Sequence, residues 1–263
     1  LKGEDIFASA QSGTGKTLGF VIPLLNRLLN NPEDKGLILA PTRELAIQIA
    51  AVVKQLSTKD MHIGTAVLIG GDSMPKQLRQ LKSSPRVIVG TPGRINDHIQ
   101  RRSLRLGTTR FLILDETDRM LDMGFGIQIE TIIELIDQNR QTLMFSATMP
   151  KKIFKVADQY LTNPKKIEIA VDNSNALRIK QDFLHTNECD KFQVLVNELE
   201  RRNGSVVLFV KTKRRAEKIA KDLARESHKT NYIHGDLKQR QREAVIKKFR
   251  SSEFRVMVAT DVA

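Results

Sequence analysis

Short apolar runs recur along the chain, and longer stretches with a helical apolar period separate them. Most of the runs are apolar on consecutive positions, which is typical of strands that are covered on both faces. This alternation predicts an α/β fold with parallel sheets flanked by helices. The predicted strands lie within residues 5–8, 36–40, 65–69, 86–89, 111–114, 142–145, 166–170, 205–210, 231–233 and 254–258.

The stretches between these runs predict amphipathic helices. We expect helices over residues 17–29 (interrupted at Pro23), 44–56, 128–136, 191–200, 215–224 and 240–249. A polar cluster, Asp172-Asn173-Ser174-Asn175, lies between two series of runs and favours a linker there. We therefore predict a first domain over residues 1–171, a linker and start of the second domain over 172–187, and a second domain over 188–263.

The two series repeat an order of features at the ends of their strands. In the first, one strand is followed by Thr42, the next by Gly70-Gly71-Asp72 and a third by Thr91. The second series has Thr212, His234-Gly235-Asp236 and Thr260 in the same order. A matched order of three features indicates an internal duplication of one α/β domain. Since ligands of parallel sheets bind at the carboxyl ends of the strands, these residues are candidate binding residues.

Composition narrows the function classes. The 263 residues carry one cysteine, Cys189, which excludes a disulfide scaffold and a cysteine-based zinc site. The five histidines share no metal-ligand spacing, and no apolar stretch reaches the ~20 residues of a membrane helix. Because the chain starts without a basic-then-apolar leader, we expect a cytoplasmic protein, or a nuclear one if the source is eukaryotic.

The net charge of +13 suggests a polyanionic partner. Residues 1–170 hold 23 basic and 17 acidic side chains, and residues 171–263 hold 20 and 13, so the second part is more densely basic. Charge alone leaves nucleic acid and simple solubility as open alternatives.

A Gly-rich segment, Ala10-Gln11-Ser12-Gly13-Thr14-Gly15-Lys16-Thr17, fits a phosphate-binding loop, except that Ala10 replaces the first glycine of the pattern. Its glycines allow backbone N–H groups to surround phosphate oxygens, and Lys16 supplies a charge for the β- and γ-phosphates. The Thr17 hydroxyl is a candidate Mg²⁺ ligand, directly or through water. A predicted strand precedes the loop and a predicted helix follows it, as such a site requires.

A second chemical motif follows the apolar run that ends at Leu114. Asp115 would stand at the sheet edge, where it could hold Mg²⁺ through water, and Glu116 would polarise the attacking water as general base. Acidic side chains that cap a helix starting near Thr117 are a compatible reading. No Asn-Lys-x-Asp motif occurs, which disfavours a GTPase. We therefore take Lys16, Asp115 and Glu116 as catalytic residues of a nucleotide site that uses Mg²⁺.

In these motifs the chain resembles the DEAD-box RNA helicases of superfamily 2, with Asp115-Glu-Thr-Asp118 as a variant of their tetrapeptide. Further matching blocks follow in order over nearly the whole chain: Pro41-Thr-Arg-Glu-Leu45, Gly70-Gly71, Thr91-Pro-Gly-Arg94, Ser146-Ala-Thr148, Val207–Thr212, His234-Gly235 with Gln239–Arg242, and Ala259-Thr-Asp261. The resemblance implies two RecA-like domains that close together on ATP and single-stranded RNA. It also implies local unwinding of duplexes by a monomer, without long-distance translocation.

The resemblance also assigns residues to RNA and to coupling. Backbone contacts to RNA, largely independent of sequence, are implied for Pro41, Thr42, Arg43, Glu44, Gly71, Thr91, Pro92, Gly93 and Arg94, and in the second domain for Thr212, Gln239, Arg242 and Thr260. Arg43, Arg94 and Arg242 would pair with phosphates. Ser146 and Thr148, with hydroxyls near Asp118, would couple the nucleotide site to domain closure.

Parts of the family pattern are missing from this chain. The family has an adenine-reading segment before the phosphate loop, and an Arg-Gly-x-Asp block and arginine fingers after the position of Thr260. We therefore expect an incomplete second domain and little RNA-stimulated ATPase activity from these 263 residues, with a longer form active. The alternatives are a non-catalytic RNA clamp and a DNA-directed ATPase of the same superfamily.

Overall fold

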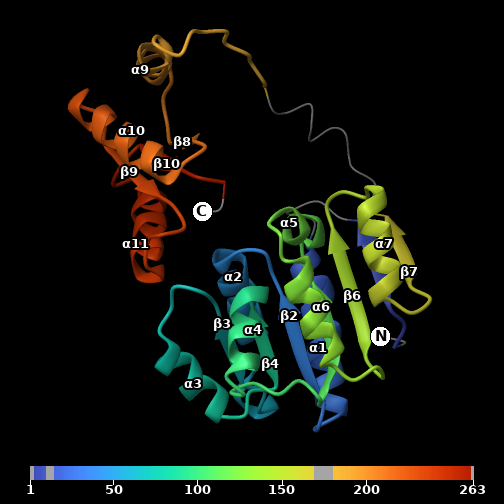
Figure 1. Ribbon diagram of the computed structural model, residues 1–263. Helices are drawn as coiled ribbons and strands as arrows, with labels where there is room; N and C mark the ends of the chain where they lie inside the picture. The colour runs from blue at the N-terminus through green and yellow to red at the C-terminus, as the bar shows by residue number, and fades with distance from the viewer. Residues whose placement is uncertain (1–2, 10–14, 169–179, 262–263) are drawn as a thin grey trace. The chain divides into compact units, whose positions relative to one another are not determined.

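The computed structural model describes residues 3–9, 15–168 and 180–261. The chain divides into two compact units, Leu1–Asp172 and Asn173–Ala263 (Figure 1). Each unit is built from a parallel sheet and flanking helices, as the alternating pattern predicted.

The first unit contains a seven-stranded sheet in the order β3-β4-β2-β5-β6-β1-β7, with every neighbouring pair parallel. The central strands are fully buried because apolar side chains occupy both of their faces. The strands are β1 (Ile6–Ser9), β2 (Lys35–Leu39), β3 (Thr65–Leu68), β4 (Val87–Gly90), β5 (Thr109–Leu114), β6 (Gln141–Ser146) and β7 (Lys165–Glu168).

Helices cover both faces of this sheet and form two apolar cores. Helices α1 (Lys16–Asn30) and α2 (Arg43–Leu56) pack on one face, and α4 (Pro92–Gln100), α5 (Thr117–Asp122), α6 (Gly126–Glu134) and α7 (Lys151–Tyr160) pack on the other (Figure 1). Helix α3 (Met74–Lys82) and a short 3-10 turn (Lys59–Met61) complete the unit.

The second unit contains a smaller parallel sheet in the order β8-β10-β9. Helices α9 and α10 share one apolar core with the sheet, and α11 packs in another. The elements are α9 (Lys191–Arg201), β8 (Val206–Phe209), α10 (Lys213–Arg225), β9 (Thr230–Ile233), α11 (Gln239–Arg250) and β10 (Val256–Ala259).

The strand orders of the two units agree with the predicted duplication. Three strands of the first unit lie in the order β2-β4-β3, and the three strands that match them in the chain lie in the order β8-β10-β9. One hydrogen-bonded arrangement is also repeated. Arg86, just before β4, donates to the carbonyls of Leu28 and Asn31, and Arg255, just before β10, donates to those of Leu199 and Arg202. The two guanidinium groups therefore hold the ends of α1 and α9, the helices that precede β2 and β8, against their sheets.

Two predictions about local structure are wrong. Helix α1 runs through Pro23 without a break, because Phe20, Val21 and the leucines of its buried face pack on the sheet and outweigh the lost hydrogen bond. Strands β7 and β8 are not covered on both faces. All four residues of β7 are exposed, and those of β8 alternate between partly buried and exposed. Both strands have one neighbour among the described strands, which leaves them at sheet edges.

Candidate nucleotide site and nucleic-acid interface

The nucleotide site lies where α1 begins and β5 ends. Residues Ala10–Thr14 of the predicted phosphate loop lie outside the described residues; Gly15, at φ +85°, caps the N-terminus of α1, which starts at Lys16. Lys16 Nζ lies 3.9 Å from Asp115 Oδ1, at the end of the central strand β5. The structure thus brings Lys16 and Asp115 together at the carboxyl edge of the sheet, beside the positive end of α1, and Thr17 follows Lys16 in the first turn of that helix.

Two buried groups at this site fit a magnesium nucleotide. Lys16 Nζ is buried and has no hydrogen-bond partner among the described residues, so its N–H groups are available for phosphate oxygens. Asp115 is 2% exposed, and burial raises its pKa to about 6, although the Lys16 ammonium acts in the opposite direction. A buried carboxylate of this kind gains a strong counter-charge when a cation binds.

Glu116 has a backbone conformation that is rare outside glycine, with φ 51° and ψ 53°. Its N–H donates to Asp115 Oδ1 at 3.0 Å, and the buried Thr117 hydroxyl donates to the Leu114 carbonyl. The left-handed turn ends β5 abruptly and places two acidic side chains next to each other at the start of α5. Such strain in a non-glycine residue is frequent at functional sites.

The coupling residues form one hydrogen-bonded group. Asp118 Oδ2 accepts hydrogen bonds from the backbone N–H of Thr148 at 3.0 Å and from its hydroxyl at 2.8 Å. The buried Ser146 hydroxyl donates to the Thr148 carbonyl at 2.6 Å. The end of β6 is therefore fastened to α5, one turn after the acidic pair Asp115-Glu116.

The predicted RNA residues of the first unit gather at the ends of three adjacent strands, β2, β4 and β3. Thr42 follows β2 and caps α2, where its hydroxyl accepts from the Leu45 N–H at 3.2 Å. The Arg43 guanidinium lies against Gly70, so closely that a Cβ there would stand 3.4 Å from it. Gly71 follows with φ +75°. Pro41 is buried beneath this edge, and Glu44 lies in the first turn of α2.

The third strand end carries Thr91, Pro92, Gly93 and Arg94. Thr91 and Pro92 are buried, whereas Gly93 is exposed at the start of α4. Arg94 Nη1 donates to the Asp72 carbonyl at 3.3 Å, and its Nε lies 3.6 Å from the Asp97 carboxylate. The edge therefore combines two helix N-termini with two arginines, a combination suited to phosphate groups.

The second unit repeats part of this edge. Thr212 follows β8 and caps α10 by accepting from the Arg215 N–H at 3.2 Å, as Thr42 does for α2. Gln239 and Thr260 are buried. Arg242 differs from the expected phosphate partner: its side chain is only 1% exposed in α11, because it packs inside the unit instead of facing solvent. Its contact with a phosphate stays a prediction.

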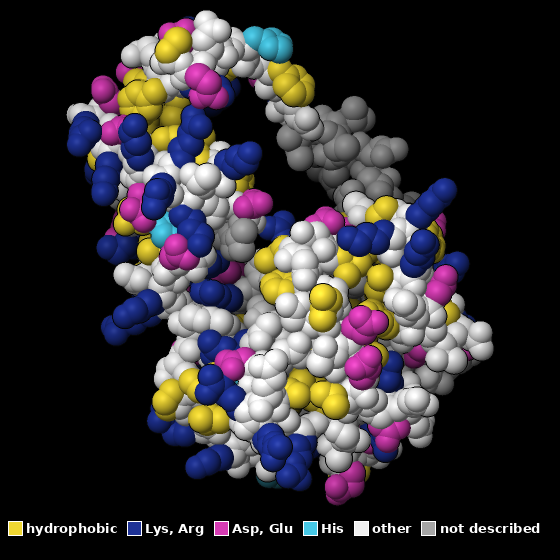
Figure 2. Space-filling model, viewed as in Figure 1, with side chains coloured by type: hydrophobic (Ala, Val, Ile, Leu, Met, Phe, Trp, Pro, Cys, Tyr) yellow, Lys and Arg dark blue, Asp and Glu magenta, His cyan; other side chains and the backbone are white. Residues whose placement is uncertain are grey.

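Exposed basic side chains are dense on the second unit. Figure 2 shows Lys and Arg over much of its visible surface, and Lys213, Arg214, Lys218, Lys221 and Arg225 of α10 are all exposed. Within the described ranges, no group of three or more His, Cys, Asp or Glu side chains is placed to hold a metal ion. None of the described helices combines the length and apolarity needed to cross a membrane.

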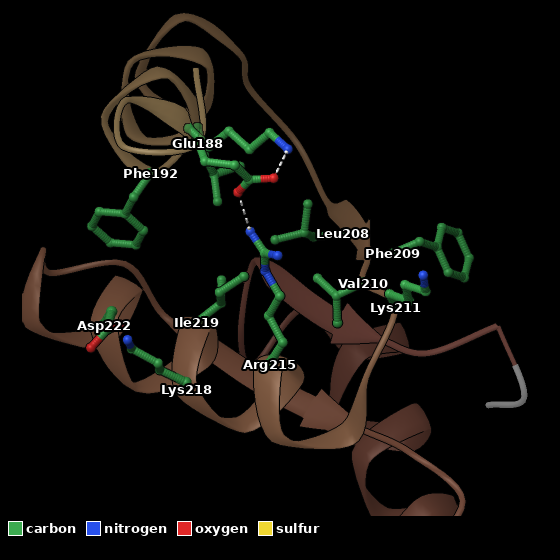
Figure 3. A pocket seen from close by; sticks show the side chains of 12 residues that line it. Glu188, Phe192, Leu208, Phe209, Val210, Lys211, Arg215, Lys218, Ile219 and Asp222 are labelled. Atoms are coloured by element: carbon green, nitrogen blue, oxygen red, sulfur yellow. Dashed lines mark hydrogen bonds and ion pairs between the residues drawn. The ribbon is translucent and has the colours of Figure 1, made fainter. Parts of the chain in front are cut away.

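A cavity of about 600 Å³ lies in the second unit between α9, α10 and β8 (Figure 3). Leu208 and Ile219 lie in its wall, and Glu188 bridges Lys191 Nζ at 2.5 Å and Arg215 Nη2 at 3.4 Å. In the first unit, side chains of β5 and β6 fill the corresponding space beside α1 and α2. The cavity is therefore a gap in the packing beside the free edge of β8, and it holds none of the predicted site residues.

Two family comparisons cover most of the chain. Residues 1–156 match the DEAD/DEAH box helicase family, and residues 190–263 match the helicase conserved C-terminal domain. The chain is 42% identical over 265 residues to the ATP-dependent RNA helicase CshA of Listeria monocytogenes, with 100% of this chain and 51% of that protein covered. It is 40% identical to the DEAD-box ATP-dependent RNA helicase CshA of Bacillus anthracis, of which it covers 50%. The chain thus spans about half the length of these curated relatives.

Solved structures of DEAD-box proteins are also similar to this chain. A DEAD box protein from Methanococcus jannaschii is similar with a TM-score of 0.61 and 39% identity, over 98% of this chain and 70% of that one. Dbp5 of S. cerevisiae bound to RNA and ADP BeF3 is similar with a TM-score of 0.81 and 32% identity, over 98% of this chain and 66% of that one.

Proposed function

The chain belongs to the DEAD/DEAH box helicase family, and we propose that it is part of an ATP-dependent RNA helicase. In this proposal Asp115-Glu-Thr-Asp118 is the family tetrapeptide with threonine at its third position. The observation that carries the proposal is the buried Lys16 ammonium, which lacks a hydrogen-bond partner in the described part of the chain and lies 3.9 Å from a buried carboxylate. A non-catalytic RNA clamp would not need to bury the Lys16 ammonium and the Asp115 carboxylate, because taking charges out of water costs free energy.

The nucleotide is proposed to be ATP with Mg²⁺. Lys16 would contact the phosphates, and Thr17 and Asp115 would hold the metal ion, partly through water. The bound Mg²⁺ would supply positive charge that offsets the negative charge of the phosphates. Glu116, next to the metal-holding carboxylate, would accept a proton from the attacking water. Asp118, Ser146 and Thr148 would transmit the state of this site to the closure of the two units on RNA.

The nucleic acid is proposed to be single-stranded RNA, bound through its backbone. The support is the edge formed by Thr42, Arg43, Gly71 and Arg94, where helix N-termini and guanidinium groups meet. Thr212 offers a second capped helix N-terminus of the same kind. Such contacts carry no base readout, so we expect RNA affinity to depend weakly on sequence and strongly on salt.

The chain covers about half of its curated relatives, so the activity is proposed for a longer form of the protein. We infer that additional sequence pairs with the free edge of β8 and fills the cavity shown in Figure 3. The 263 residues by themselves are expected to bind ATP and RNA but to hydrolyse ATP slowly. We still expect the protein to be cytoplasmic and monomeric.

The test is ATP hydrolysis by a longer form, with and without single-stranded RNA. We expect stimulation by RNA and its loss in Glu116→Gln, while RNA binding persists, because the substitution removes the proton acceptor but no phosphate contact. Stimulation by DNA equal to that by RNA would instead favour the DNA-directed ATPase. Full RNA binding with no ATP turnover in the unmodified protein would favour the clamp.

A further inference from the structure

A buried polar chain joins α3 to α4 directly beneath the strand-end edge of the first unit. Gln77 and His98 are both 0% exposed, and His98 Nε2 lies 3.2 Å from Gln77 Oε1. His98 Nδ1 lies 2.8 Å from the Ser103 hydroxyl. Buried polar side chains are costly unless they are fully hydrogen-bonded, so a connected network of this kind holds its members in one geometry.

The hydrogen bonds of the Gln77 amide show which nitrogen of His98 donates. The Gln77 amide donates to the carbonyls of Ile69 at 3.1 Å and of Asp72 at 3.3 Å. Its Oε1 is left as an acceptor, so His98 donates from Nε2. The Ser103 hydroxyl lies 2.8 Å from His98 Nδ1 and donates to the His98 carbonyl at 3.0 Å. Burial, together with the nearby Arg94 guanidinium, lowers the pKa of His98, in accord with a neutral ring.

The network ends on the turn that presents Gly71. Both carbonyls held by Gln77 flank Gly70 and Gly71, and Gly71 adopts φ +75°. The Asp72 carbonyl also accepts from Arg94 Nη1 at 3.3 Å. Gln77 and Arg94 therefore share one acceptor, and the position of that carbonyl sets the position of the guanidinium.

We propose that Gln77 and His98 are positioning residues that set the Gly70–Ser73 turn and Arg94 in the geometry needed to bind an RNA backbone. They contact no ligand themselves and act through the Asp72 carbonyl. In the second unit Gln239, which matches Gln77 in the repeat, donates to Glu243 of its own helix at 3.3 Å. This inference rests on the proposed RNA function of the edge.

The test compares RNA binding by the 263-residue chain and its variants, using a fluorescent single-stranded oligouridylate. We expect Gln77→Leu and His98→Leu to weaken RNA binding about tenfold, because an unsatisfied buried carbonyl leaves Arg94 free to move. His98→Gln, which keeps a donor toward Gln77, should recover most of the affinity. The affinity for a fluorescent ATP analogue should stay unchanged in all three variants.

The matched control is Ile132→Ala, which opens a cavity at a buried position of α6 in the same unit without touching the turn. RNA affinity that falls equally in the control and in Gln77→Leu would reduce the network to a structural role and overturn the proposal. Unchanged RNA affinity in a folded Gln77→Leu variant would also overturn it.

A measurement without RNA separates this proposal from the proposed function. In the nitrogen NMR spectrum of the unmodified chain, His98 should show a neutral ring protonated at Nε2. Resonances of Gly71 and of the Arg94 side chain should shift in His98→Leu but not in Ile132→Ala. If these shifts occur but the chain binds no RNA, only the proposed RNA function is contradicted. A His98 ring protonated at Nδ1, or an Arg94 resonance that does not shift, would contradict the positioning role.

Discussion

The two units share a local design but differ in what surrounds it. In each, three parallel strands lie in the same order, and a threonine caps the helix after the first of them. An arginine before the middle strand ties the helix that precedes the first strand, α1 or α9, to the sheet. In the first unit this motif lies inside a seven-stranded sheet with a buried lysine and a buried aspartate at its edge. The second unit has three described strands, and no buried lysine or aspartate lies among its described residues. The two units thus share the strand-end edge that we propose for RNA, whereas the residues that we propose for the nucleotide lie in the first unit.

The largest expected difference between the units is the loss of stability when a side chain is truncated at equivalent strand positions. Leu39 and Phe209 end the equivalent strands β2 and β8, but Leu39 is 0% exposed and Phe209 is 67% exposed. We expect Leu39→Ala to lower the free energy of unfolding of the first unit by about 2–5 kcal/mol, through lost burial and a cavity. Phe209→Ala should change that of the second unit by less than about 0.5 kcal/mol.

Urea unfolding followed by segment-resolved hydrogen exchange measures both values. An equal loss at the two positions would mean that β8 is covered as β2 is. In a longer form that fills the free edge of β8, Phe209→Ala should become several-fold more destabilising.

Nucleotide binding should distinguish the units almost as strongly. We expect Lys16→Ala to weaken ATP binding about 100-fold, because a buried ammonium that faces phosphate oxygens makes charge-assisted hydrogen bonds. Lys213→Ala is the matched control, since Lys213 is exposed at the start of α10 and pairs with Asp236. Titration of each variant with a fluorescent ATP analogue gives both affinities. A comparable loss in Lys213→Ala would indicate a nucleotide contact from the second unit.

The pH dependence of magnesium binding should report Asp115. Burial raises the pKa of this carboxyl to about 6, and Mg²⁺ binds only its ionised form. The affinity for magnesium nucleotide should therefore be constant above about pH 7 and fall as pH drops through 6, by up to about tenfold per unit.

Isothermal titration across this pH range measures the effect. The Asp115→Asn variant provides the reference, because the nucleotide's own titration is the same in both proteins. Parallel pH profiles for the two proteins would show that Asp115 is already ionised without the metal.

The smallest effect should be equal in the two units. Thr42→Ala and Thr212→Ala each remove one hydroxyl that caps a helix, at the same donor distance of 3.2 Å. Each should destabilise its own unit by about 1 kcal/mol. Thr131→Ala is the control, because that exposed hydroxyl bonds within α6 and caps nothing. Thermal unfolding of the three variants makes the comparison; a large difference between the two caps would weaken the case for a repeated edge.

The strands were predictable from the sequence because buried parallel strands are apolar at consecutive positions, as in β4 and β5. Helices α3, α4 and α7 were not predicted; all three begin at or beside a proline, which by itself indicates a turn. The positions of Lys16, Asp115 and Thr42 followed from the rule that ligands meet strand ends. The burial of Arg242 did not, because its charge predicts exposure and only tertiary packing reverses it.

The His98–Gln77 link was also beyond the sequence pattern. Gln77 stands out through its place in the repeat, but His98 belongs to a helix of nine residues and shares no spacing with another histidine. Its role depends on two side chains from different helices meeting in the core, which a pattern along the chain does not encode.

Hydrogen exchange of the 263-residue chain with magnesium ATP and single-stranded RNA tests the central claim most directly. We predict that the nucleotide slows exchange in residues 15–17 and 115–118, and that RNA slows it at the strand ends of both units, in 42–45, 70–73, 91–95 and 212–216. Protection by RNA along the exposed basic face of α10, with none at the strand ends of the first unit, would contradict the account.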